Sequence, residues 1–102
     1  MNKQARIIQV DGKEIPTRPA NPEEGFTLSE CYDAVRFHPE DKDIMIEVVN
    51  LSHGMLMIVD EEGILKNLPI NETATMMAAT HALMGSKGIQ GHVLVCPSEM
   101  FQ

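Results

Sequence analysis

The chain has 102 residues, and its 8 Lys and Arg against 15 Asp and Glu give a formal net charge of −7 at pH 7. This length supports one domain with one core, and 43% hydrophobic and 23% charged residues are typical of a folded protein. The dispersed cations form no basic stripe, which argues against nucleic acid as a partner. The apolar runs are shorter than the ~20 residues of a membrane-spanning helix, and no signal peptide is recognised. We therefore expect a single cytoplasmic domain, residues 1–102, with no membrane partner.

A β-hairpin is predicted at the start of the chain. The β-rich residues 4–10 and 13–15 flank Asp11-Gly12, a pair typical of two-residue hairpin turns that need positive φ. Pro16, Pro19 and Pro22 follow within seven positions. Because proline donates no backbone hydrogen bond, we expect an extended, irregular loop there.

The first predicted helix begins at Thr27. Thr27 and Glu30 fit a capping box, and Phe26 is placed to pack against Cys31. Apolar residues then follow at helical spacing, and Pro39 ends the pattern, so we expect about three turns. The apolar stripe consists of Leu28, Cys31, Tyr32 and Val35.

The second half predicts a three-stranded meander, a helix and a last strand. Residues 44–49, 55–59 and 64–66 are β-rich runs separated by turn residues. Asn71 is a good helix cap, and the helix is expected to run to Met84, before Gly85. Residues 92–96 form the final strand. The predicted fold class is α+β, an antiparallel sheet made of a hairpin and a meander and packed by two helices.

The second helix predicts self-association. Residues 73–86 contain no formally charged side chain, and the apolar positions point in several directions around the helix. One side can pack on the sheet, and another is then available to a second copy of the chain, giving a homo-oligomer. The alternative is that the amino-terminal loop covers the helix. The predicted oligomer interface consists of Met76, Met77, Ala79, Thr80, Leu83 and Met84.

Two features favour a small anionic ligand. A helix start at Asn71 presents backbone N–H groups, and the glycine-rich segment 85–91 can form a nest of N–H groups around a phosphate. Lys66 and Lys87 would supply counter-charge. Simple helix capping and an ordinary helix-to-strand connection are the alternative interpretations. The predicted ligand-binding residues are Asn71, Lys66, Ser86, Lys87, Gly88 and Gly91.

No catalytic or metal-binding constellation is recognised in the sequence. The four histidines, His38, His53, His81 and His92, are not spaced as a preformed metal site, so no metal and no cofactor are expected. Cys31 lies on an apolar stripe and reads as a core residue, while Cys96 at a strand end is the more exposed thiol. We expect a protein that is not an enzyme.

Most of the chain, roughly residues 4–97, resembles a known family, most strongly from Val59 to Thr75. The resemblance rests on residues 57–63 (Met-Ile-Val-Asp-Glu-Glu-Gly), 65–71 (Leu-Lys-Asn-Leu-Pro-Ile-Asn), Ala74-Thr75 and 91–95 (Gly-His-Val-Leu-Val). These runs are similar to a small family of phage and plasmid proteins catalogued as a domain of unknown function. Family members often have an acidic residue where this chain has His92. The resemblance implies a mobile-element origin and the bacterial cytosol as the place of work.

Three classes of function follow for a phage protein of this size. The first is a non-enzymatic binder that sequesters a small anionic host nucleotide signal, as a counter-defence, in pockets between subunits of a homo-oligomer. The second is an acidic protein-binding inhibitor of a host protein, such as a nucleic-acid mimic. The third is a small nucleotide-cleaving enzyme, which the missing catalytic constellation disfavours. We favour the first.

Overall fold

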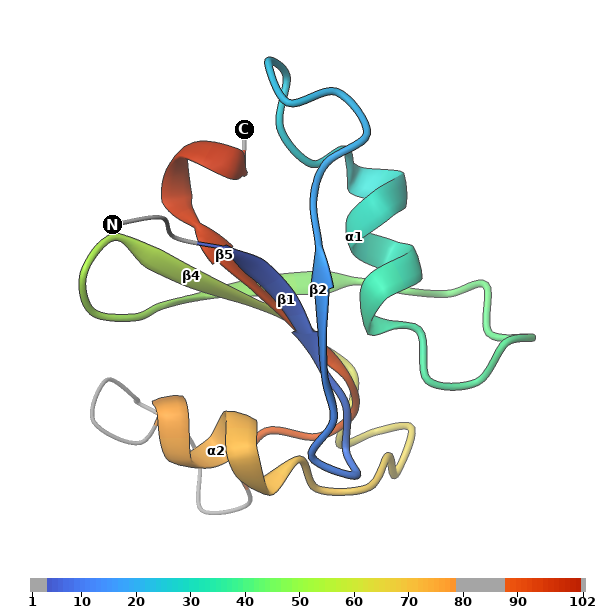
Figure 1. The fold of residues 1–102 in the computed structure, drawn as a ribbon. Coiled ribbons are helices and arrows are strands. Elements are labelled where there is room, and N and C mark those ends of the chain that lie inside the picture. Colours follow the sequence, from blue (N-terminus) through green and yellow to red (C-terminus); the bar gives the residue numbers. More distant parts are fainter. Residues whose placement is uncertain (1–3, 79–87, 102) are drawn as a thin grey trace.

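The computed structural model describes residues 4–78 and 88–101 (Figure 1). In these two segments, strands and helices follow one another in the order β1, β2, α1, β3, β4, α2, β5 and η1, the last being a short 3-10 helix. Their bounds are Ala5–Ile8 (β1), Glu14–Thr17 (β2), Leu28–Val35 (α1), Ile46–Asn50 (β3), Met55–Asp60 (β4), Glu72–Ala78 (α2), Val93–Pro97 (β5) and Ser98–Met100 (η1).

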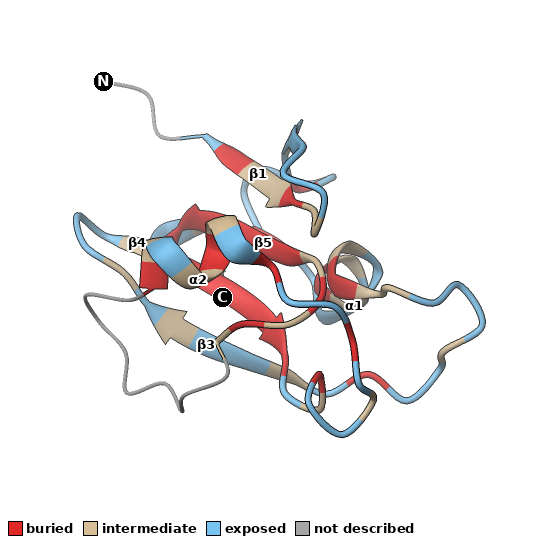
Figure 2. Ribbon diagram, turned by 90° about the horizontal axis from the view of Figure 1, so that it is seen from below, coloured by how far each residue is buried: buried red, intermediate tan, exposed pale blue. Residues whose placement is uncertain are grey.

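The strands form one antiparallel sheet in the order β2-β1-β5-β4-β3. β5 comes last in the sequence but lies in the centre of the sheet, and all of its residues are buried. β2 and β3 form the two edges, and Figure 2 shows β3 as a mostly exposed strand beside the buried centre. The predicted α+β fold is confirmed.

The two α-helices cover opposite faces of this sheet (Figure 1). Successive side chains of a strand point to opposite faces, and β5 shows the consequence. Leu94 and Cys96 pack in the cluster that contains α1, while Val93 and Val95 pack in the cluster that contains α2. The core therefore consists of two apolar layers, one on each side of the sheet.

The β1–β2 hairpin closes through a longer turn than predicted. Gln9 N–H donates to the carbonyl of Lys13 at 2.9 Å, and Gly12 N–H donates to that of Gln9 at 2.9 Å. Within the turn, residues 9–13, only Gly12 has a positive φ, 93°. This is a type I turn followed by a bulge at glycine, not a two-residue turn with two positive φ values. The side chain of Asp11 stabilises it by accepting from the N–H of Lys13 at 3.0 Å.

Helix α1 begins as predicted but is shorter. The Thr27 side chain accepts from Glu30 N–H at 3.1 Å, and the Glu30 carboxylate accepts from Thr27 N–H at 2.8 Å, so the capping box is confirmed. The helix has 8 residues, about two turns. Leu28 was predicted on the buried stripe, but it is 57% exposed. The buried face consists of Cys31 and Val35 alone.

The predicted third strand of the meander, residues 64–66, is wrong. Residues 61–67 form consecutive turns, in which Lys66 N–H donates to Glu62 and Asn67 N–H donates to Ile64. The physical reason is competition for an edge. β4 pairs with β3 on one side and β5 on the other, so no free edge of β4 remains for a further strand.

Helix α2 begins after Asn71, as predicted, and is described as far as Ala78. The Asn71 side chain accepts from Ala74 N–H at 3.0 Å, which makes it the N-cap. The predicted continuation to Met84 lies outside the described residues.

Candidate functional site

Asn71, the first predicted ligand residue, is completely buried and bonded to the protein itself. Its Nδ2 donates to the carbonyls of Ile8 and Gly91, each at 2.9 Å, while its Oδ1 caps α2. Its own N–H donates to the carbonyl of Ile89 at 2.8 Å. The residue thus joins α2 to the end of β1 and to the segment before β5, which is a structural role.

Gly88 and Gly91, two further predicted ligand residues, lie where the backbone passes close to side chains. A Cβ at Gly88 would lie 2.8 Å from the Thr75 hydroxyl oxygen, and a Cβ at Gly91 would lie 2.9 Å from Leu68 Cδ1. Thr75 in turn accepts from Ile89 N–H at 2.9 Å. Tight packing against α2 and the preceding turn explains both glycines.

Lys66, predicted as counter-charge for a ligand, has protein partners instead. Its Nζ lies 2.8 Å from a carboxylate oxygen of Asp41 and 2.8 Å from one of Asp60, and donates to the carbonyl of Asp43 at 2.7 Å. Burial acts to lower the pKa of Lys66, but hydrogen bonds to the two carboxylates outweigh it and raise the pKa. The hydrogen bond from Lys66 lowers the pKa of Asp41. The positive charge of Lys66 is therefore already balanced by the carboxylates of Asp41 and Asp60.

Of the remaining predicted residues, two lie on the described part of α2, and the others lie outside the described residues. Met76 is 77% exposed and Met77 is half-buried on α2. The exposed position of Met76 leaves it available to a second copy. Outside the described residues lie Ser86 and Lys87 of the predicted ligand site, and Ala79, Thr80, Leu83 and Met84 of the predicted interface.

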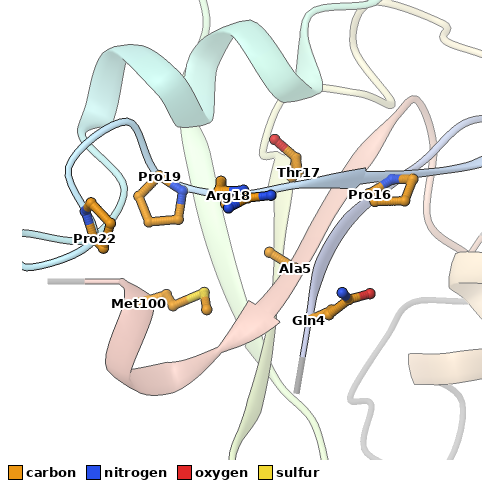
Figure 3. Close-up of a pocket in the computed structure, with 8 residues that line it drawn as sticks. All are labelled: Gln4, Ala5, Pro16, Thr17, Arg18, Pro19, Pro22 and Met100. Atoms are coloured by element: carbon orange, nitrogen blue, oxygen red, sulfur yellow. The ribbon is translucent and has the colours of Figure 1, made fainter. Parts of the chain in front are cut away.

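A hollow that the sequence did not single out opens beside the proline-containing loop after β2 (Figure 3). Its volume is about 650 Å³. In the view of Figure 3, Pro19, Pro22 and Met100 lie to one side of Arg18, and Pro16 and Gln4 to the other. The loop, the start of β1 and η1 each contribute to the wall. The lining residues are Gln4, Ala5, Pro16, Thr17, Arg18, Pro19, Pro22 and Met100.

Arg18 has no ion-pair partner among the described residues, as is also true of Lys13 and Lys42, but of these three cations only Arg18 lines the 650 Å³ hollow. Arg6 Nε lies 2.9 Å from a carboxylate oxygen of Glu14, an ion pair without hydrogen-bond geometry. Arg36 pairs with Asp33, and Lys66 is balanced as described above. Among the residues that line the 650 Å³ hollow, none is acidic. The positive charge of Arg18 is therefore uncompensated within it.

Three smaller hollows have a different electrostatic character. One of about 220 Å³ contains Glu30 and Asp33 as well as Arg18, and one of about 100 Å³ contains acidic side chains and no cation. A third, of about 280 Å³, contains Arg6, whose charge is met by Glu14. Of these four hollows, the largest suits an anion best.

The two thiols are buried, and His92 is half-buried and hydrogen-bonded within the fold. Cys31 and Cys96 are both 0% exposed, so the expectation that Cys96 is the more exposed thiol is wrong. Burial raises the pKa of each thiol to about 11, which keeps both protonated at neutral pH. Burial lowers the pKa of His92, whose Nδ1 accepts from Val10 N–H at 3.3 Å. Within residues 4–78 and 88–101, no group of three or more His, Cys, Asp or Glu side chains is arranged to hold a metal ion.

The described helices are all too short or too polar to cross a bilayer. Comparison with protein-family models, with curated proteins and with solved structures finds no match to this chain. Membership of the phage and plasmid family therefore stays a prediction.

Proposed function

We propose that this chain is a non-enzymatic binding protein that takes up a small anionic, nucleotide-like molecule in the hollow beside Arg18. The observation that carries the proposal is an arginine without an ion-pair partner among the described residues, in the wall of a hollow of about 650 Å³. A guanidinium group binds phosphate or carboxylate through paired hydrogen bonds.

The size and chemistry of the wall suit such a ligand. Small-molecule sites commonly occupy roughly 300–1,000 Å³ and combine apolar walls with a few polar groups. Here the prolines, Ala5 and Met100 supply apolar surface, while Gln4 and Thr17 add an amide and a hydroxyl to the Arg18 charge. Proline-bounded walls also lose little conformational entropy on binding.

The biological part of the proposal comes from the family resemblance. A phage protein of this size acts as a counter-defence by sequestering a host nucleotide signal, without converting it. Self-association remains part of this proposal, and the 77% exposed Met76 on α2 supports it. The predicted ligand residues Asn71 and Lys66 support the packing of the protein, so the Arg18 hollow replaces them as our preferred site.

Isothermal titration calorimetry of the purified protein against cyclic dinucleotides and cyclic ADP-ribose isomers tests the proposal. We expect binding that Arg18→Ala weakens about tenfold or more, because a hydrogen bond to a charged group contributes about 1.5–3 kcal/mol. Lys13→Ala is the matched control, since Lys13 is an exposed cation in the β1–β2 turn, outside the hollow. No heat with any ligand contradicts the proposal, and conversion of a nucleotide to a new product favours an enzyme.

A second candidate, an acidic protein-binding inhibitor, is favoured by one surface observation. The turn before α2 exposes three apolar residues, with Ile64 at 54%, Leu65 at 83% and Ile70 at 51%. Exposed Glu61 lies on the same turn. Apolar residues edged by acidic ones suit a basic protein partner. Recovery of one basic host protein in a salt-sensitive complex, lost in Leu65→Ser, would favour this candidate.

A further inference from the structure

The two edges of the sheet differ in their capacity to accept another strand. At the β2 edge, the hydrogen bond from Gln9 N–H to the Lys13 carbonyl shows which residues of β2 direct their backbone N–H and C=O groups toward β1. In an antiparallel pair, bonded and non-bonded residue pairs alternate. Pro16 lies opposite Arg6 in a pair that is not hydrogen-bonded, so its backbone nitrogen and carbonyl point away from the sheet. Proline offers no N–H there, so the middle of this edge is blocked.

The β3 edge has no such block. Glu61 N–H donates to Met45 and Leu51 N–H donates to Met55, so the odd-numbered residues of β3 bond to β4. By the same alternation, the even-numbered residues direct their N–H and C=O groups away from the sheet. In the part of the chain that the structure describes, no strand pairs with them. The outward residues are Ile46, Val48 and Asn50.

We propose that a second copy of this chain pairs antiparallel with β3 about a two-fold axis at Val48. In this register, Val48 lies opposite Val48 of the partner subunit, and Ile46 lies opposite the partner's Asn50. Every outward N–H and C=O of both strands then finds a partner. A shift by two residues in either direction leaves one end of each β3 without a partner strand, so the centred register satisfies the most backbone groups.

The side chains of β3 are compatible with this symmetric pairing. Glu47 lies opposite the partner's Val49, so no acidic residue of β3 is directly opposed by another. The two copies of Glu47 are diagonal neighbours, where repulsion is weaker. Val48, now 38% exposed, gains a β-branched cross-strand partner, and Met45 at 54% lies just before the strand. This interface is separate from the α2 surface of the proposed function and forms a continuous ten-stranded sheet from two five-stranded ones.

The first experiment removes the outward donor without touching the monomer's own ladder. Val48→Pro removes an outward-pointing N–H from the β3 edge, as Pro16 does at the β2 edge. The hydrogen bonds between β3 and β4 are kept, because this N–H points away from β4. Val48→Thr is the matched control, which keeps the N–H and a β-branched shape. Sedimentation equilibrium at about 100 μM protein, where mass action favours association, gives the mass of each assembly.

We expect the wild type and Val48→Thr to share one assembly mass, and Val48→Pro to have at most half of it. Val48→Lys, which places two lysines opposite each other, should give the same loss, and circular dichroism identifies any variant that fails to fold. A monomeric wild type overturns the proposal. An equal assembly mass in the wild type, Val48→Pro and Val48→Lys also overturns it, even if another surface holds the subunits together.

The second experiment tests the register by disulfide formation. Opposed residues of a bonded antiparallel pair have Cα atoms about 5.5 Å apart, within disulfide range. Val48→Cys should therefore form a covalent dimer on mild oxidation. In Asn50→Cys the two thiols lie four residues apart along the strands, about 13 Å, and should not cross-link. Equal cross-linking of both variants, or none in either, overturns this register. The natural thiols do not interfere because both are buried.

Discussion

Asn71 shows how one buried side chain can hold three segments of the fold together. It caps α2 through Oδ1 and binds the carbonyls of Ile8 and Gly91 through Nδ2. Capping was predictable from an asparagine at a helix start. The two other bonds join residues 63 and 20 positions away, so no local pattern reveals them.

Asn71→Ala should lower the free energy of unfolding by about 2–4 kcal/mol. The loss combines a helix cap, about 1 kcal/mol, with two buried carbonyl groups left without their donor. Chemical denaturation monitored by circular dichroism measures it. Thr27→Ala is the matched control, because Thr27 caps α1 from an exposed position, and it should cost only about 1 kcal/mol. Equal losses in the two variants would contradict a joining role for Asn71.

At the scale of elements, Lys66 holds the turn after β4 against the connection between α1 and β3. The Asp60 side chain is only 1% exposed, so removal of its cationic partner leaves a buried charge. Lys66→Met should therefore lower the free energy of unfolding by about 3 kcal/mol. Lys42→Met, which changes a lysine without an ion-pair partner among the described residues, should have little effect, and thermal denaturation compares the two.

The pH dependence of stability follows from the same contacts. The pKa of Asp41 is lowered in the folded state, so its contribution is present above the ordinary value of about 4 and is lost as pH falls through the folded pKa. The pKa of Lys66 is raised, so its contribution is present below about 10.4 and is lost as pH rises through the folded pKa. The wild type should thus lose stability at both ends of the pH range. In Lys66→Met, the free energy of unfolding should change less steeply with pH at both ends.

Local signals predicted most of the elements correctly. The capping box located α1, Asp11-Gly12 located the first hairpin, and β-branched runs located β3, β4 and β5 within a few residues. The strand predicted at residues 64–66 failed because pairing depends on which edge is free, and β5, distant in sequence, occupies that edge of β4. β-propensity alone does not contain this information.

The candidate site was less predictable than the fold. Gln4, Arg18 and Met100 meet around one hollow although they span nearly the whole described chain. A helix start and a glycine-rich segment are local features, so the sequence favoured them as an anion site. Asn71, Gly88 and Gly91 instead serve packing and internal hydrogen bonds. The weak signal for the hollow was an arginine among three prolines, where a rigid loop holds a charge at the surface.

At the scale of the whole molecule, whose net charge is −7, added salt acts in opposite directions on the two proposed kinds of binding. Two copies that pair along β3 bring like charges together, and salt screens that repulsion. An anionic ligand at Arg18 is attracted by the guanidinium, and salt weakens that attraction. Raising the salt concentration from about 0.01 M to 0.15 M shortens the Debye length from about 30 Å to 8 Å. We expect self-association to strengthen and ligand affinity to fall over this range, as measured by sedimentation and calorimetry on the same protein. Arg18→Ala should remove the fall in ligand affinity with rising salt and leave the salt dependence of assembly unchanged, whereas equal salt trends for the two kinds of binding would contradict two independent sites.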